Sequence, residues 1–132
     1  MKAPGAAPPG GDEAGSPEVL LVYVTMPDEA GDGVAARTLA RALVEQGLAA
    51  GVNVLCGARS VYRWRGEIRE AGECLLLAQV AAPAFAAFRA AVVARHPHVT
   101  PCILGLAVAA GHAPFVRWIR ENSAAENSAE NS

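Results

Sequence analysis

Hydrophobic positions along the chain follow two kinds of spacing. The shorter one, which repeats every two residues, predicts four strands. The run that starts at Val19 is short, apolar and β-branched, as in a buried strand, and Met26-Pro27-Asp28 closes it as a loop. The longest alternating stretch carries Tyr62 and Trp64 on one face and bends at Cys56-Gly57. The predicted strands are residues 19–24, 50–65, 74–80 and 103–108.

A second period, of three to four residues, predicts three helices. In the first helix Ala36, Leu39 and Leu43 share one face, and Gly47 supplies the stop. The second ends before Pro97, because the residue that precedes a proline avoids the helical conformation. The predicted helices are residues 33–46, residues 83–96, and a terminal helix that begins at Pro114 and aligns Phe115, Trp118 and Ile119 in one apolar stripe.

The elements follow one another in the order β-α-β-β-α-β-α, and Arg65-Gly66-Glu67 turns the chain between the second and third strands. This order predicts an α+β fold, a ferredoxin-like split βαβ sandwich with two helices on one face of an antiparallel sheet. The last helix is an addition to that fold. The other face of such a sheet and the long edges of its hairpin need a covering surface. The pattern therefore predicts an oligomer.

Composition and charge narrow the class of protein further. The chain has 132 residues, and 11 basic against 13 acidic side chains give a net charge of −2. This balance excludes both a dedicated nucleic-acid-binding surface and a polyacidic disordered chain. No apolar run reaches the roughly 18 to 20 residues that cross a bilayer, and the N-terminal stretch lacks the apolar region of an export signal. We therefore expect a cytoplasmic protein of one domain without nucleic-acid or membrane partners.

The two ends differ in composition from the chain between them. Residues 1–18 are rich in proline and glycine and predict a flexible arm. Residues 124–132 repeat Glu-Asn-Ser and predict a low-complexity polar tail. The predicted domain, residues 19–123, carries ten arginines and eight acidic side chains, so its own net charge is +2.

The three cysteines, Cys56, Cys74 and Cys102, lie 18 and 28 residues apart and form no Cys-x-x-Cys pair. We therefore expect neither a disulfide framework nor a structural zinc site, and we expect a reducing compartment. Cys74 opens an apolar strand, which predicts a buried and inert thiol.

Several strings of residues stand in a characteristic order. They are Val24-Thr25-Met26-Pro27, residues 48–53, residues 60–68 with the pattern Ser-x-Tyr-x-Trp-x-Gly, residues 96–101 with the pattern His-Pro-x-x-x-Pro, and residues 115–119. With these strings, from residue 19 to about residue 123, the chain resembles the CutA family of divalent-cation tolerance proteins. The resemblance implies a ferredoxin-like fold, a tight homotrimer built by strand pairing between subunits, and a link to copper and other divalent metals. It implies no known catalysed reaction.

One copper-binding arrangement in that family uses a cysteine near the end of the first strand and two adjacent histidines. This chain has Val24, Arg95 and His96 at those positions, so one ligand of three is present. His96, His98 and Cys102 lie within seven residues and together suit copper or zinc. We predict weak Cu or Zn binding there and no required cofactor. The alternative interpretation is a helix cap at His96 and a cysteine packed as a small hydrophobe.

Three aromatic residues are candidates for a binding cleft or for the trimer interface. Tyr62, Trp64 and Trp118 can stack on a small molecule while their polar tips form hydrogen bonds. Aromatic residues at strand or helix spacing also serve as ordinary core or interface residues. We predict that these three line the trimer interface or a cleft within it.

The sequence offers no set of residues that predicts catalysis. No nucleophile with a neighbouring base, no paired carboxylates and no phosphate-binding glycine loop occur at a known spacing. We therefore expect a non-catalytic trimer of the divalent-cation tolerance type, which responds to metal ions or senses a small ligand at clefts between subunits. The alternative is a structural or scaffolding trimer that presents its termini to partner proteins.

Overall fold

The computed structural model describes residues 18–125, and its elements alternate as the sequence predicts. Residues 1–17 of the predicted arm and residues 126–132 of the predicted tail lie outside the described residues. The elements are β1 (Val19–Pro27), α2 (Val34–Glu45), β2 (Gly51–Trp64), β3 (Glu67–Ala81), the short 3₁₀ helix η1 (Ala82–Ala84), α3 (Phe85–Arg95), β4 (Ile103–Ala107) and α4 (Ala113–Asn122).

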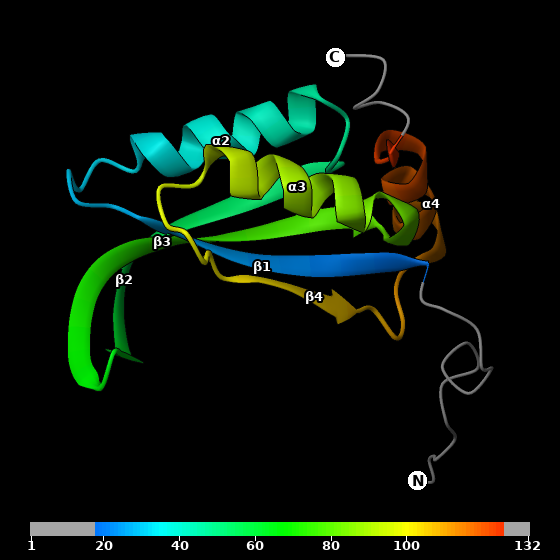
Figure 1. Ribbon diagram of the computed structural model, residues 1–132. Coiled ribbons are helices and arrows are strands. Elements are labelled where there is room, and N and C mark those ends of the chain that lie inside the picture. Colours follow the sequence, from blue (N-terminus) through cyan, green and yellow to red (C-terminus); the bar gives the residue numbers. More distant parts are fainter. Residues whose placement is uncertain (1–17, 126–132) are drawn as a thin grey trace, which may run out of the picture.

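The four strands form one antiparallel sheet in the order β2-β3-β1-β4. Helices α2 and α3 cover one face of this sheet, and α4 packs at the end of the sheet where β1 begins (Figure 1). The predicted ferredoxin-like α+β fold with an additional C-terminal helix is therefore confirmed.

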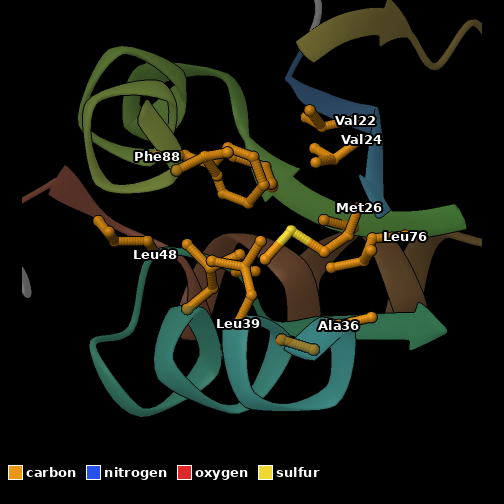
Figure 2. Close-up of a cluster of buried hydrophobic side chains, with 14 of the residues drawn as sticks. Val22, Val24, Met26, Ala36, Leu39, Leu48, Leu76 and Phe88 are labelled. Atoms are coloured by element: carbon orange, nitrogen blue, oxygen red, sulfur yellow. The ribbon is translucent and has the colours of Figure 1, made fainter. Parts of the chain in front are cut away.

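The core lies between the two helices and the sheet, because β1 alternates buried and partly exposed side chains. Val22, Val24 and Met26 are buried on the helix side of β1. Leu39 from α2 and Phe88 from α3 pack into the same cluster (Figure 2). Full burial of a side chain of this size contributes roughly 1.5–3 kcal/mol, so this cluster fixes both helices on the sheet.

The β2–β3 hairpin is longer than predicted, because β3 begins at Glu67 and not at residue 74. Arg65 and Gly66 form its two-residue loop with positive φ values of 52° and 80°, as the right-handed twist of a hairpin requires. The register shifts between Leu55 and Ala58, which confirms the predicted bend in β2.

Cys56 and Cys74 form a disulfide, so the prediction that the cysteines form none is wrong. The hairpin closes their 18-residue separation, since Leu55 pairs with Leu75 and Ala58 pairs with Glu73 on the two sides of the bulge. Cys74 is buried, as predicted, but it is bonded to a partner. The free cysteine is Cys102. The cysteines therefore give no support to the expectation of a reducing compartment.

Candidate functional site

A cleft of about 590 Å³ lies between the β2–β3 hairpin and the segment that leads into β4. The hairpin makes one wall because it bends away from the helix layer (Figure 1). The cleft is lined by Thr25, Ser60, Tyr62, Trp64, Arg69, Glu73, Pro97, His98, Val99, Thr100 and Cys102.

The wall formed by the hairpin follows from strand alternation. Ser60, Tyr62 and Trp64 are spaced by two residues and therefore point to the same side of β2. Arg69 pairs with Tyr62 in the antiparallel register and shares that side. The Ser60 hydroxyl donates a hydrogen bond to the Glu73 carboxylate over 2.5 Å, which fixes this carboxylate at the wall of the cleft.

Both signs of charge and two aromatic rings meet in the cleft. Arg69 forms an exposed ion pair with Glu67 over 3.3 Å, and the Glu73 carboxylate stands on the same strand. The guanidinium of Arg65 lies 5.6 Å from the centre of the Trp64 ring. Sites for small organic ligands usually combine aromatic side chains with a few polar groups, as this cleft does.

Cys102 contributes a thiol to the cleft, and its surroundings disfavour the thiolate form. Burial raises the pKa of the Cys102 thiol, and the Glu73 carboxylate raises that pKa further, against a smaller opposing effect of a hydrogen bond with Thr25. The thiolate is the form that attacks electrophiles and binds metals. At any given pH the thiolate fraction of Cys102 is therefore lower than that of an unperturbed thiol.

The structure divides the three residues predicted to bind a metal between the cleft and the core, although the ring centres of His96 and His98 lie 5.0 Å apart. His98 and Cys102 line the cleft, whereas His96 is buried and bonded to the backbone at both ring nitrogens. Its Nε2 lies 2.8 Å from the carbonyl oxygen of Thr25, and its Nδ1 accepts the backbone N–H of His98 over 3.1 Å. Metal binding at these three residues stays a prediction, and it would require His96 to give up one of these hydrogen bonds.

The three aromatic candidates also occupy two places. Tyr62 and Trp64 line the cleft, and both are nearly half exposed. Trp118 lies on α4, where its ring stacks on Phe115 with the ring centres 5.1 Å apart. One of its ring atoms would be 3.4 Å from a Cβ added to Gly51, so Trp118 packs on the start of β2, and it is not among the residues that line the cleft.

Sequence reasoning missed a second group of side chains with metal-binding chemistry. Within residues 18–125, the group of three such side chains whose ligand atoms lie within 4.8 Å of one another is Asp28, Cys56 and Cys74. The sequence held a signal for the cysteine pair. If the strands on the two sides of the Arg65-Gly66 turn pair residue by residue, position 74 falls within one residue of position 56 on the facing strand. Asp28 gave no signal of this kind.

The family model of the CutA1 divalent ion tolerance protein matches residues 20–122. The chain belongs to the CutA1 family. The divalent-cation tolerance protein CutA of Thermus thermophilus is 43% identical over 103 residues, which cover 78% of this chain and 96% of that protein. The human protein CutA is 33% identical over 103 residues, and the chain spans about half of its length, 55%.

Solved structures of CutA1 proteins show the same fold. The Thermus thermophilus structure superposes with a TM-score of 0.74 at 42% identity, and it covers 80% of this chain and 98% of that chain. CutA1 from a psychrotrophic Shewanella superposes with a TM-score of 0.75 at 30% identity, covering 83% and 98%. The predicted family is confirmed, and its name refers to divalent ions and not to a reaction.

The compartment of this CutA1 family member stays a prediction. The CutA protein of Archaeoglobus fulgidus is described as periplasmic, and that of Arabidopsis thaliana as chloroplastic. Among the described residues, no helix has the length and hydropathy needed to span a membrane.

Proposed function

We propose that the chain acts as a non-catalytic homotrimer in the response to divalent metal ions, with a small-ligand cleft that a neighbouring subunit completes. The link to divalent ions is supported by the family to which the chain belongs. The observation that carries the proposal is the apolar character of the sheet face opposite the helices.

That face can be traced from the strand register. Tyr23 pairs with Leu77 on one side and with Leu104 on the other, and Leu55 pairs with Leu75. Directly paired residues of an antiparallel sheet point to the same face, so these side chains adjoin one another. None of the five is fully buried in the single chain. A continuous apolar surface of this kind typically marks a protein interface.

The edges of the sheet support the same assembly. In the order β2-β3-β1-β4, strands β2 and β4 each have one edge that pairs with no other strand among residues 18–125. Unpaired edges of this length invite strand pairing with another chain. The cleft lies beside β2 and next to the start of β4, so a neighbouring subunit paired at an edge would close its open side.

A non-catalytic role is supported by the state of the two nucleophiles in the cleft. The Ser60 hydroxyl donates to the carboxylate of Glu73, and a carboxylate is a weaker base than the imidazole that activates a catalytic serine. Burial and the Glu73 carboxylate raise the pKa of the Cys102 thiol and so disfavour its thiolate form. An activated nucleophile needs an adjacent base or a lowered pKa.

The assembly is tested by light scattering on the full chain with one charged substitution on the open face. Leu104, 59% exposed, lies on that face, and Val93, 48% exposed, lies on α3. We expect the wild type and Val93→Lys to have the mass of a trimer, and Leu104→Lys to dissociate. A monomeric wild type, or a Leu104→Lys variant that remains trimeric, would contradict the proposal.

The response to divalent ions is tested in a host that lacks the gene. We expect this host to differ from its parent strain in tolerance of copper or zinc, and we expect the full chain to restore the tolerance of the parent strain. A truncated chain of residues 18–125 separates this role from scaffolding. Restoration by both chains supports the proposal, whereas restoration by the full chain alone favours a scaffold that presents its termini.

A further inference from the structure

A second candidate site lies on the other side of the sheet from the cleft, at the bulge of β2. Asp28 follows β1, Cys56 lies in the bulge, and Cys74 lies opposite it in β3. One ligand atom from each of the three falls within 4.8 Å of the others. Cys74 is buried on the helix side of the sheet, whereas its neighbour Glu73 faces the cleft, so the two sites are separate.

The turn that follows β1 holds the carboxylate in place. The backbone N–H of Gly33 donates to Asp28 Oδ1 over 2.9 Å, and Asp28 donates its own N–H to the carbonyl oxygen of Gly72 over 3.1 Å. A Cβ added to Gly33 would lie 3.0 Å from Cys56 Sγ and 3.8 Å from Cys74 Sγ, so this turn packs directly on both sulfurs. Ligands that are oriented by such outer hydrogen bonds bind metals more tightly.

We infer that the reduced chain binds one thiophilic divalent cation, such as Zn²⁺, between the thiolates of Cys56 and Cys74 and the carboxylate of Asp28. Two sulfurs and one carboxylate oxygen are a donor set that zinc accepts, and water can take the fourth tetrahedral position. The donor set is soft enough to prefer zinc or copper to magnesium or calcium.

The charge at this place also suits a divalent cation. Two thiolates and one carboxylate around a divalent cation leave a net charge of −1. Arg37 Nη1 and Cys56 Sγ would each lie 3.0 Å from a Cβ added to Gly33. The guanidinium of Arg37 therefore stands beside the site. Arg37 also donates to the carbonyl oxygen of Asp32 over 3.0 Å, which holds it there. A neighbouring cation stabilises the thiolate form of a cysteine.

The site opens by thiol–disulfide exchange with a dithiol reductant. One reductant thiolate attacks the exposed Cys56 Sγ and displaces Cys74 as a thiolate, and the second reductant thiol then releases Cys56. The protein disulfide gains two electrons and two protons, and the dithiol becomes a disulfide. Binding of the cation then releases the two cysteine protons. The cation is therefore bound in reducing conditions and released on oxidation.

These ligands differ from the copper arrangement that the family resemblance implies, which would fall on Val24, Arg95 and His96. They also differ from the residues that line the cleft. The inference does not depend on the proposed assembly, and light scattering reports on that assembly separately.

The test is calorimetric titration of the full chain with Zn²⁺, once oxidised and once after reduction by a dithiol that is removed under nitrogen. We expect one Zn²⁺ per chain in the reduced form and none at this place in the oxidised form. Titration with Cd²⁺ adds a spectroscopic readout, because cadmium–thiolate bonds absorb in the ultraviolet. A reduced chain that binds Zn²⁺ no more tightly than the oxidised chain would overturn the inference.

Two matched pairs of variants locate the site. Asp28→Asn keeps an oxygen that accepts the Gly33 N–H, and we expect it to weaken Zn²⁺ binding about tenfold or more. Glu29→Gln removes a neighbouring exposed carboxylate and should leave the affinity unchanged. Cys56→Ser replaces an exposed side chain and should abolish the cadmium absorption, whereas Cys102→Ser should keep it. Equal loss in Cys102→Ser and Cys56→Ser, or in Glu29→Gln and Asp28→Asn, would place the cation elsewhere and overturn the inference.

Discussion

His96 donates a hydrogen bond from Nε2 to the carbonyl oxygen of Thr25 over 2.8 Å, which joins the end of α3 to β1. Its Nδ1 accepts the backbone N–H of His98, so the neutral ring carries its proton on Nε2. Both polar atoms of this buried side chain are thereby satisfied. The residue that the sequence marks as a metal ligand therefore connects the helix layer to the sheet.

We predict that His96→Ala destabilises the chain by about 1–3 kcal/mol, because it leaves the Thr25 carbonyl and the His98 N–H without their partner. Urea denaturation measures this loss. His98→Ala is the matched control, since it removes only an exposed ring whose centre lies 5.0 Å from that of His96 and keeps the backbone N–H that His96 accepts. Its stability should stay within about 0.5 kcal/mol of the wild type.

The opposite result would favour the metal site predicted from the sequence. In that case His96→Ala would unfold at the wild-type urea concentration, and its affinity for Zn²⁺ or Cu²⁺ would fall in step with that of Cys102→Ser. The same two titrations therefore distinguish a structural histidine from a ligand.

The fold was predictable because its signals are local and periodic. The spacing of Ala36, Leu39 and Leu43 gave α2, and the alternation from residue 50 gave β2 with its bend. Errors fall where pairing with another strand, and not the local pattern, decides the structure. The first part of β3, residues 67–73, has no apolar alternation, and Pro27 is in β1 because it pairs with Glu73. Pro27 is tolerated there because β4 pairs only with residues 20–24 of β1.

The candidate site was less predictable, because it depends on contacts between residues far apart in the sequence. Tyr62 and Trp64 could be assigned to one face from alternation, but their approach to His98 depends on the curvature of the hairpin. The Cys56–Cys74 disulfide depends on the hairpin register, and Asp28 joins it only through the turn at Gly33.

We predict that Gly33→Ala destabilises the chain more than Gly31→Ala does. Gly33 has a φ of 70° and Gly31 a φ of 78°, so each substitution costs about 1–2 kcal/mol because alanine disfavours the left-handed backbone. A Cβ on Gly31 meets nothing within 4 Å, whereas one on Gly33 meets Cys56 Sγ and Arg37 at 3.0 Å. Overpacking should add about 1–3 kcal/mol in Gly33→Ala, measured by urea denaturation of the oxidised chain. Equal losses would show that the turn does not pack on the disulfide.

The last prediction concerns the pH at which Cys102 reacts. With the disulfide intact, Cys102 is the free cysteine, so iodoacetamide should add one label per chain in non-reducing buffer. Its thiol pKa is raised, which lowers the thiolate fraction at any given pH. The labelling rate should therefore rise with pH around a midpoint above that of an unperturbed thiol, about 8.5. A midpoint at or below that value would contradict the assigned surroundings, and a second or third label would show that the disulfide is open.

The substitution Glu73→Gln then separates the two causes of this shift. Removal of the carboxylate charge should move the midpoint of Cys102 labelling to lower pH, because a neighbouring negative charge disfavours the thiolate. The midpoint should nevertheless stay above the ordinary value, since burial is the larger cause and the glutamine preserves it. Glu70→Gln serves as the control. Glu70 is an exposed residue of the same strand, it forms an ion pair with Arg59, and it does not line the cleft. A midpoint that moves equally in both variants would indicate a general effect of net charge, whereas a shift in Glu73→Gln alone places the carboxylate beside the thiol.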